Sequence, residues 1–338
     1  MDNMKNAIPE YCAKLGKDSL LVQGAGGNVS WKENDTLWIK ASGTWLSEAE
    51  NSDIFVPVDL QHLREELRNQ NFGVTPKLKQ QSQLKPSIET VLHALMPHRI
   101  VVHLHAVEVL AHLVRDNCEA NFQKILADTS PWVMTDYYKP GEDLARAVSE
   151  ATSNRPDVDI VFLHNHGLVI GGDNIDDIDN HLTNLTTKLG TLSHRDNYGP
   201  ASVLPVGIKE LEQYEAITDN RIQQLALEPV LFEQTNKNWA LYPDHIVFLG
   251  AHPNTFNSVD TFIHKCEVNG HWPELIFIKD VGVFAKTTFS QAKYEQLFCY
   301  YNVLVRQDDF SCLKTLSKHQ IDELINWDAE KYRMKVAK

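Results

Sequence analysis

The sequence has few cysteines and no long hydrophobic run, and both absences exclude classes of protein. Its 338 residues include five cysteines, none of which forms a C-x-x-C pair. An odd number of scattered cysteines argues against a disulfide framework and against a cysteine-built zinc site. The apolar stretches reach about eight residues, whereas roughly twenty are needed to cross a bilayer. The N-terminus lacks a basic region followed by an apolar core. We therefore expect a cytoplasmic protein without a membrane partner.

Positive charge is also scarce. Lysine and arginine together number 32, aspartate and glutamate 45, and the formal net charge is −13. Sequence-independent nucleic-acid binding depends on neutralising phosphates with lysine and arginine, so we expect no nucleic-acid partner. If the substrate is anionic, its attraction must be local, from a metal, a helix N-terminus or single lysines.

Histidine is the residue type that carries the most information. His103 and His105 alternate within one apolar run, and a β-strand turns alternate side chains to the same face. A second pair, His164 and His166, ends another apolar run, and Glu89 lies upstream of both pairs. Three neutral imidazoles with a carboxylate or water satisfy a divalent zinc and leave a position open for substrate. Either histidine of the second pair could supply the third imidazole.

A glycine-rich segment, Gly24 to Asn28, follows a short apolar stretch. It is no dinucleotide fingerprint, because Val29 holds the sixth position of the pattern, and no Gly-Lys-Ser/Thr follows for a P-loop. A backbone nest for a phosphate is the functional interpretation, and a simple tight turn is the structural one.

Alternating helix and strand patterns predict a layered α/β domain. We expect strands at 20–22, 37–41, 100–105 and 158–163, and helices at 4–15, 58–69, 106–115, 142–152 and 176–194. The pattern lapses into Asn, Tyr, Gly, Pro and Ser at 197–207.

Beyond that lapse a smaller C-terminal α/β unit is expected. A helix is predicted at 208–225, before this unit. The strands of the unit are predicted at 245–249, 275–279 and 281–285, and its helices at 259–267, 289–306 and 317–333. We place the domains at 1–225 and 226–338, with no catalytic cluster visible in the second.

Six short motifs occur in an order typical of one family. They are Gly26-Gly27-Asn28-Val29-Ser30, Ala41-Ser42-Gly43, Pro86-Ser87-Ile88-Glu89, His103-Leu104-His105, Tyr137-Tyr138-Lys139-Pro140-Gly141 and Asn165-His166-Gly167. The sequence resembles the class II aldolase/adducin family, which includes L-fuculose-phosphate and rhamnulose-phosphate aldolases and ribulose-phosphate 4-epimerases. The tail resembles the linking region of the long predicted rhamnose-utilisation aldolase/dehydrogenases, without the dehydrogenase part. The resemblance implies a three-layer α/β/α domain and a homo-oligomer, with a tetramer as one form.

The resemblance also implies a metal site. Its ligands would be His103, His105 and His166, holding Zn²⁺ or another divalent metal, which favours His166 over His164. Glu89 would be the catalytic acid/base, with burial expected to raise its pKa. Tyr137 would be a proton donor to the sugar part of the substrate, acting from a neighbouring subunit.

A phosphate pocket follows from the same resemblance. Its residues would be Gly27, Asn28, Ser42, Gly43 and Ser87, with Lys40 or Lys85 adding charge. Ile88 stands where the fuculose enzyme has a second serine, so one phosphate hydroxyl is missing.

The implied activity is a zinc-dependent aldolase acting on a sugar phosphate. It would reversibly cleave a ketose 1-phosphate to dihydroxyacetone phosphate and an aldehyde through a metal-stabilised enediolate. The alternatives are a pentulose 5-phosphate 4-epimerase that uses the same site and a non-catalytic scaffold like adducin.

We expect none of the following histidines to bind the metal directly. We expect His93 to contact the site from behind or to pack within its helix. His62, His98, His112 and His245 are expected to be solvated.

Overall fold

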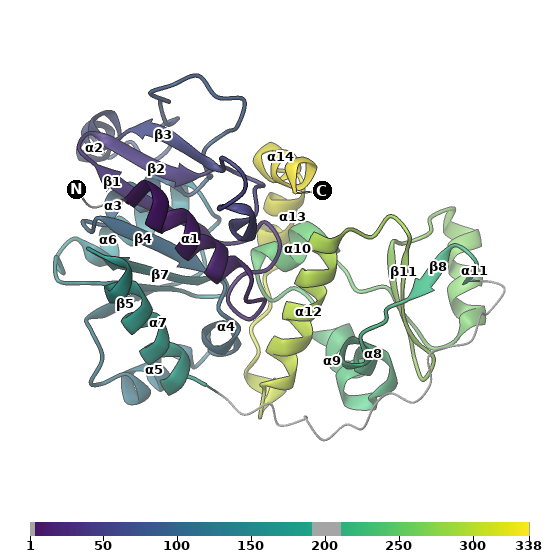
Figure 1. Cartoon of the computed structure of the whole chain (residues 1–338). Coiled ribbons are helices and arrows are strands. Elements are labelled where there is room, and N and C mark those ends of the chain that lie inside the picture. The colour runs from purple at the N-terminus through teal and green to yellow at the C-terminus, as the bar shows by residue number, and fades with distance from the viewer. Residues whose placement is uncertain (1–3, 191–210, 338) are drawn as a thin grey trace.

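A seven-stranded sheet forms the centre of the larger part of the molecule (Figure 1). The computed structural model describes residues 4–190 and 211–337. The strand order is β3-β2-β1-β4-β7-β6-β5, antiparallel except between β5 and β6. The strands are β1 (Asn28–Glu33), β2 (Thr36–Lys40), β3 (Phe55–Asp59), β4 (Ile100–Leu104), β5 (Trp132–Thr135), β6 (Ile160–Leu163) and β7 (Gly167–Gly172).

Helices cover both faces of this sheet because its strands carry apolar side chains on both. Val102 and Val101 of β4 point to opposite faces, and each belongs to a different buried cluster. The first face packs against α1 (Met4–Gly16), α4 (Val107–Leu113), α5 (Cys118–Ile125) and α7 (Ile175–Lys188). The second packs against α2 (Leu60–Arg68), α3 (Thr90–Leu95) and α6 (Glu142–Thr152). The three-layer α/β/α prediction is confirmed.

The C-terminal part has a smaller sheet of its own. Its order is β8-β11-β10-β9. Its strands are β8 (Tyr214–Ala216), β9 (Thr255–Phe256), β10 (Leu275–Ile278) and β11 (Gly282–Lys286), with helices α8 (Asn220–Leu227), α9 (Pro229–Lys237) and α11 (Val259–Asn269).

Four further C-terminal helices lie toward the larger sheet (Figure 1). They are α10 (Pro243–Leu249), α12 (Gln291–Val305), α13 (Lys318–Ile325) and α14 (Asp328–Val336); short 3-10 turns, η1 and η3, cover Leu46–Glu48 and Phe310–Cys312. Buried residues of α10 and α12 join those of α1, α4 and α7 in one hydrophobic cluster. The two units therefore share a core, and the boundary at 225 stays a prediction.

Several predicted elements are wrong. The predicted strand 245–249 is helix α10, which begins at Pro243, a residue preset for the first helical turn. A short buried apolar run does not by itself distinguish helix from strand. The predicted strand 20–22 is a turn, and the predicted helix 317–333 divides into α13 and α14.

Other elements were not predicted at all. Strands β1, β3, β5 and β7 were missed, and the described part of the predicted helix 208–225 holds β8 before α8. The segment 197–207, the end of the helix predicted at 176–194 and the start of the one predicted at 208–225 lie outside the described residues. Within 4–190 and 211–337, none of the helices combines the length and apolarity needed to span a bilayer.

Candidate active site

Three histidines converge where two strands of the large sheet end. His103 lies in β4 and His105 just after it, while His166 lies in the turn between β6 and β7. That turn is closed by Asn165 in the left-handed conformation at φ 52°, which asparagine tolerates better than most residues. One ring nitrogen from each histidine lies within 4.8 Å of the others, and all three side chains are buried. No other such group of three occurs among the residues that the structure describes.

The outer ring nitrogens show which atoms face the centre. His103 Nδ1 lies 3.0 Å from the Leu168 carbonyl oxygen, which can only accept, so Nδ1 carries the proton. His105 Nδ1 lies 3.4 Å from the Asp244 carboxylate, which when ionised only accepts, although the two atoms do not form a hydrogen bond in this geometry. With the proton of His105 on Nδ1 as well, the two Nε2 atoms present lone pairs 3.1 Å apart. Two lone pairs at this distance repel unless a cation lies between them, so the site fits a divalent metal.

Glu89 lies beside this group as the residue before α3. Its Oε2 lies 3.4 Å from His103 Nε2, and its Oε1 lies 3.6 Å from His166 Nε2. The Asn28 amide donates to Oε2 at 2.8 Å, because β1 pairs with β4 and sets Asn28 opposite His103. Buried Oε1 has no hydrogen-bond partner within the described chain. One carboxylate oxygen is thus fixed and the other is available.

The protonation states suit cation binding. Burial lowers the pKa of His103, and it lowers that of His166 to about 3, so both rings are neutral near pH 7. Burial alone raises the pKa of Glu89, but His103, His166 and the Asn28 amide outweigh it and bring the pKa to about 2. The expectation of a raised pKa for Glu89 is wrong, because the neighbouring imidazoles and the Asn28 amide outweigh the effect of burial.

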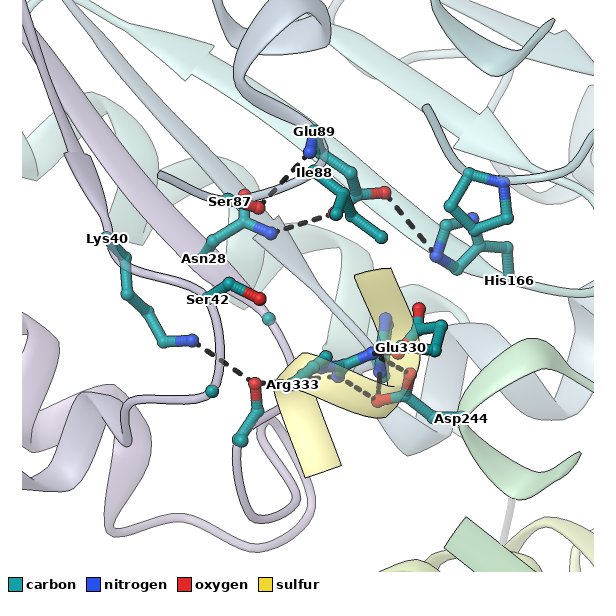
Figure 2. Close-up of a pocket in the computed structure, with 15 residues that line it drawn as sticks. Asn28, Lys40, Ser42, Ser87, Ile88, Glu89, His166, Asp244, Glu330 and Arg333 are labelled. Carbon is teal, nitrogen blue, oxygen red and sulfur yellow. Dashed lines mark hydrogen bonds and ion pairs between the residues drawn. The ribbon is translucent and has the colours of Figure 1, made fainter. Parts of the chain in front are cut away.

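A small cavity of about 30 Å³ adjoins His105 and His166 (Figure 2). The five residues predicted for a phosphate pocket all line it, together with Ile88, Glu89, His105 and His166. The five are Gly27, Asn28, Ser42, Gly43 and Ser87. The structure brings them together from β1, the loop after β2 and the loop before α3. Their role in holding a phosphate stays a prediction.

Of the two lysines considered, only Lys40 lines the cavity. It is buried, its Nζ donates to the Ala25 carbonyl at 3.2 Å, and burial lowers its pKa to about 7. Lys85 is exposed, and its ammonium group lies over the Tyr332 ring at 4.6 Å.

Part of the glycine-rich segment has a different partner. The Gly24 amide donates to Glu295 of α12 at 2.5 Å, so this amide is already used within the chain. Only Ala25, Gly27 and Asn28 of the segment line the cavity. The Gly24 amide is therefore not free to bind a phosphate, and a phosphate nest in the rest of the segment stays a prediction.

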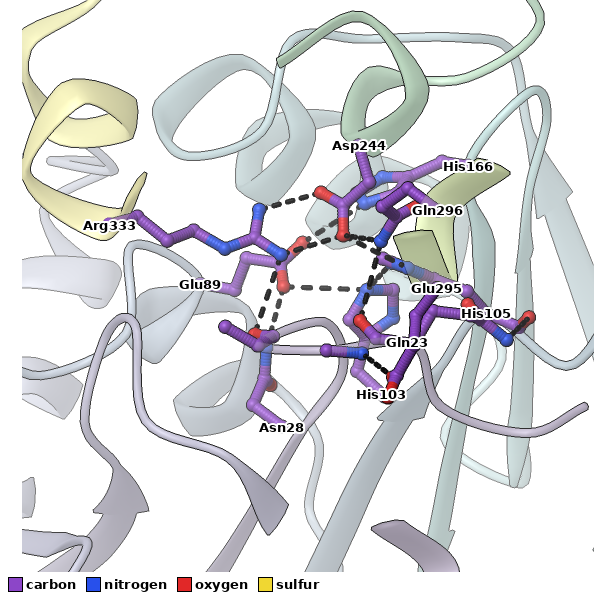
Figure 3. A network of polar contacts seen from close by, with 12 residues as sticks. Gln23, Asn28, Glu89, His103, His105, His166, Asp244, Glu295, Gln296 and Arg333 are labelled. Carbon is purple, nitrogen blue, oxygen red and sulfur yellow. Dashed lines mark hydrogen bonds and ion pairs between the residues drawn. The ribbon is translucent and has the colours of Figure 1, made fainter. Parts of the chain in front are cut away.

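The C-terminal unit supplies cavity residues that the sequence did not reveal. Asp244 of α10 and Glu330 and Arg333 of α14 line it. Arg333 makes two 2.6 Å contacts with the two oxygens of Asp244 (Figure 3). Asp244 and Glu330 are buried, and the side chain of Arg333 is 12% exposed. Burial raises the pKa of Asp244, but Arg333 and His105 hold it well below its usual range. No catalytic cluster was expected after residue 225, and the structure brings these three charged residues to the cavity.

Helix α14 closes one side of the cavity. Gly43 has a φ of +82°, and a Cβ there would lie 2.6 Å from the Cβ of Val336. Glycine at 43 thus serves both the left-handed backbone and the close approach of α14. No sequence spacing links Val336 to Ser42-Gly43, so only the tertiary structure could reveal this contact.

Tyr137 is not among the residues that line the cavity of this chain. Its hydroxyl has no hydrogen-bond partner in the part of the chain that is described, and burial, with Glu323 and Glu330, raises its pKa. Its role as a proton donor stays a prediction.

The remaining histidines lie outside the cluster. His164 points away from it, with Nε2 3.0 Å from the Arg115 carbonyl. His93 lies behind Glu89, with Nδ1 2.7 Å from the Ser30 hydroxyl. His112 and His245 are buried, so their expected solvation is wrong.

Residues 6–188 match the family described as Class II Aldolase and Adducin N-terminal domain. The chain belongs to this family. The family contains lyases that act on sugar phosphates.

Curated relatives match the same half of the chain. An L-fuculose phosphate aldolase of Methanocaldococcus jannaschii is 30% identical over 182 residues, which cover 51% of this chain and 86% of that protein. A methylthioribulose-1-phosphate dehydratase of Pyricularia oryzae is 26% identical over 204 residues, 52% of this chain and 78% of that protein. An uncharacterized oxidoreductase, YuxG, of Bacillus subtilis is 27% identical over 175 residues, which cover 47% of this chain and 25% of that protein. The chain thus matches about a quarter of YuxG.

Among solved structures, the N-terminal class II aldolase domain of a conserved protein from Thermoplasma acidophilum is similar. It is 26% identical, with a TM-score of 0.47, and the match covers 56% of this chain and 93% of that one.

Proposed function

We propose that this protein is a divalent-metal-dependent aldolase that reversibly splits a ketose 1-phosphate into dihydroxyacetone phosphate and an aldehyde. The observation that carries the proposal is the group of three buried imidazoles with an ionised carboxylate beside it. His103, His105 and His166 would hold the cation, with zinc as the first candidate. Such a cation, bound by neutral ligands, keeps its full charge and stabilises the enediolate oxygens.

Glu89 would act as the base in the direction of synthesis. Ionised, and with Oε1 unpartnered in the described structure, it takes a proton from C3 of dihydroxyacetone phosphate. The electron pair of that C–H bond passes into the enediolate and then forms the bond to the aldehyde carbon. The aldehyde oxygen becomes an alkoxide and takes a proton. We propose Tyr137, from a neighbouring copy in a homo-oligomer, as its donor.

The phosphate would lie toward Ser42, Ser87 and Lys40. Two hydroxyls, the amides of the neighbouring glycines and one ammonium group can donate to its oxygens. Ile88 offers no donor there, which favours a substrate whose phosphate needs fewer hydroxyl contacts.

The test is to assay the metal-loaded protein with ketose 1-phosphates, a pentulose 5-phosphate and methylthioribulose 1-phosphate. Release of dihydroxyacetone phosphate supports the aldolase, whereas inversion at C4 without net cleavage identifies the epimerase. Loss of water identifies a dehydratase, as the name of the P. oryzae relative describes. No turnover of any substrate contradicts the proposal, and with no bound metal it favours the scaffold.

His103→Ala is the matching variant. It is expected to lose both the metal and the turnover. His319→Ala is the control, because its side chain is 83% exposed on α13, and it should retain both.

A further inference from the structure

The three candidate ligands differ in what holds their outer nitrogens. His103 Nδ1 donates to a backbone carbonyl of the same sheet. The Nδ1 of His166 has no partner in the described regions. His105 Nδ1 also makes no hydrogen bond there, but it lies at ion-pair distance, 3.4 Å, from Asp244, a carboxylate from the C-terminal unit. The ring nitrogen that does not bind a metal fixes the tautomer and the orientation of a histidine ligand, so these partners matter for the metal.

Asp244 is itself held from two sides (Figure 3). Arg333 contacts both carboxylate oxygens at 2.6 Å, and the Gln296 amide lies 3.3 Å from Oδ2. Gln296 also lies 3.3 Å from the carbonyl of Gln23, at the start of the glycine-rich segment. Asp244 is 2% exposed, so bulk water has little access to its oxygens.

The backbone beside His105 leaves room for this carboxylate. A Cβ on Gly26 would lie 3.0 Å from Asp244 Oδ2 and 3.3 Å from His105 Nδ1. The absence of a side chain at 26 therefore permits the approach of a group whose residue lies more than 200 positions later.

We propose that Asp244, held by Arg333, is a positioning residue that orients His105 toward the metal, so that the C-terminal unit completes the metal site. This inference rests on the proposed function only in that it requires His105 to bind a metal. Asp244 accepts the proton of Nδ1, which leaves the Nε2 lone pair for the cation and makes the ring a stronger donor.

The experiment measures the dissociation constant for zinc by competition with a chelator, and the visible absorption of the cobalt-loaded protein. Asp244→Asn keeps the shape and removes the charge, and it is expected to weaken zinc binding about 10- to 100-fold. The cobalt absorption should shift, because the donor strength of one ligand changes.

A double variant separates orientation from mere packing. Asp244→Asn alone leaves Arg333 without its main counter-charge, whereas Asp244→Asn with Arg333→Met removes both charges. If Asp244 orients His105, the double variant still binds zinc weakly. Recovery of wild-type affinity in the double variant would overturn the proposal.

Arg306→Met is the matched control. Arg306, the residue after α12, pairs with Glu108 of α4 at 2.8 Å and also joins the C-terminal unit to the helices of the large sheet, but it lies outside the cavity. Its zinc affinity should stay within about 2-fold. An equal loss in this variant would show that loosened packing explains the effect and would overturn the proposal.

The outcomes separate the two proposals. If the wild type binds zinc and Asp244→Asn binds it equally well, this inference fails and the proposed function stands. If the wild type binds zinc through Asp244-dependent His105 but turns over no sugar phosphate, the proposed function fails and this inference stands. If the wild type binds no zinc, both fail.

Discussion

The two halves of the candidate site come from regions built in different ways. The first half comes from neighbouring parts of the large sheet and the residue before α3, where strand register sets the positions of the side chains. It consists of His103, His105, His166 and Glu89. Asp244, Glu330 and Arg333 come from separate helices of the C-terminal unit and reach the cavity only because those helices pack against the sheet. The first half should supply chemistry, and the second should supply orientation and closure.

The largest expected effect tests the chemical half. Glu89→Gln keeps the size of the side chain and an oxygen that can accept from the Asn28 amide. It removes the base, so turnover should fall about 10²- to 10⁴-fold. Zinc content should remain near one equivalent, because the three imidazoles are unchanged. Turnover assays with metal analysis check both points, and undiminished turnover would remove Glu89 from the mechanism.

Breaking the ion pair between the C-terminal unit and α4 should lower the free energy of unfolding without affecting zinc binding. Arg306→Met removes contacts from Nε and Nη2 to Glu108, so the free energy of unfolding should fall by about 2–4 kcal/mol. Urea unfolding with the metal removed measures this change. A variant as stable as the wild type would mean that the shared apolar core alone joins the units.

A pH experiment tests the buried core of the C-terminal unit. His245 is fully buried among Trp239, Tyr242 and Tyr300, and burial lowers its pKa to about 3. The unfolded chain, with a pKa near 6.5, then binds more protons than the folded chain between these values, so stability falls as pH falls below about 6.5. From pH 8 to pH 5 this residue should account for about 2 kcal/mol.

The matching variant is His245→Phe, which has no titrating group. Its loss of unfolding free energy between pH 8 and pH 5, measured in urea, should be smaller than that of the wild type by that amount. Identical losses in both proteins would show that His245 stays neutral on unfolding or is protonated in the folded state.

The smallest expected effect concerns the close contact between Gly26 and Asp244 of the C-terminal unit. Gly26→Ala sets a Cβ 2.9 Å from the Gln23 carbonyl and 3.0 Å from Asp244 Oδ2, so one of them must move. We expect zinc binding to weaken about tenfold and unfolding free energy to fall by about 1 kcal/mol. Chelator competition and urea unfolding measure these, and unchanged zinc affinity would show that Asp244 can shift without disturbing His105.

Local patterns predicted the part of the site that local geometry controls. Alternation placed His103 and His105 on one side of a strand, and β4 does run through His103. The choice of His166 over His164 came from the family motif, and the turn at Asn165 explains it, because it directs only His166 to the cluster. The strands between these motifs were missed, since short half-apolar stretches such as 55–59 carry no distinct period.

Nothing in the order of residues connects Asp244 or Arg333 to His105. Each is one charged residue in an ordinary helix, and both acquire their role by burial against a partner distant in the chain. The pKa of Glu89 was predicted in the wrong direction for the same reason, because the outcome depends on which polar groups surround a buried carboxylate.

The sequence by itself determined the family, the layered α/β class and the imidazole and carboxylate groups available for a metal, because strand period and short motifs act over a few residues. The tertiary structure alone decided that two separate C-terminal helices, α10 and α14, both reach the cavity. Packing of apolar faces brings distant charges together, and no local pattern records which faces will meet.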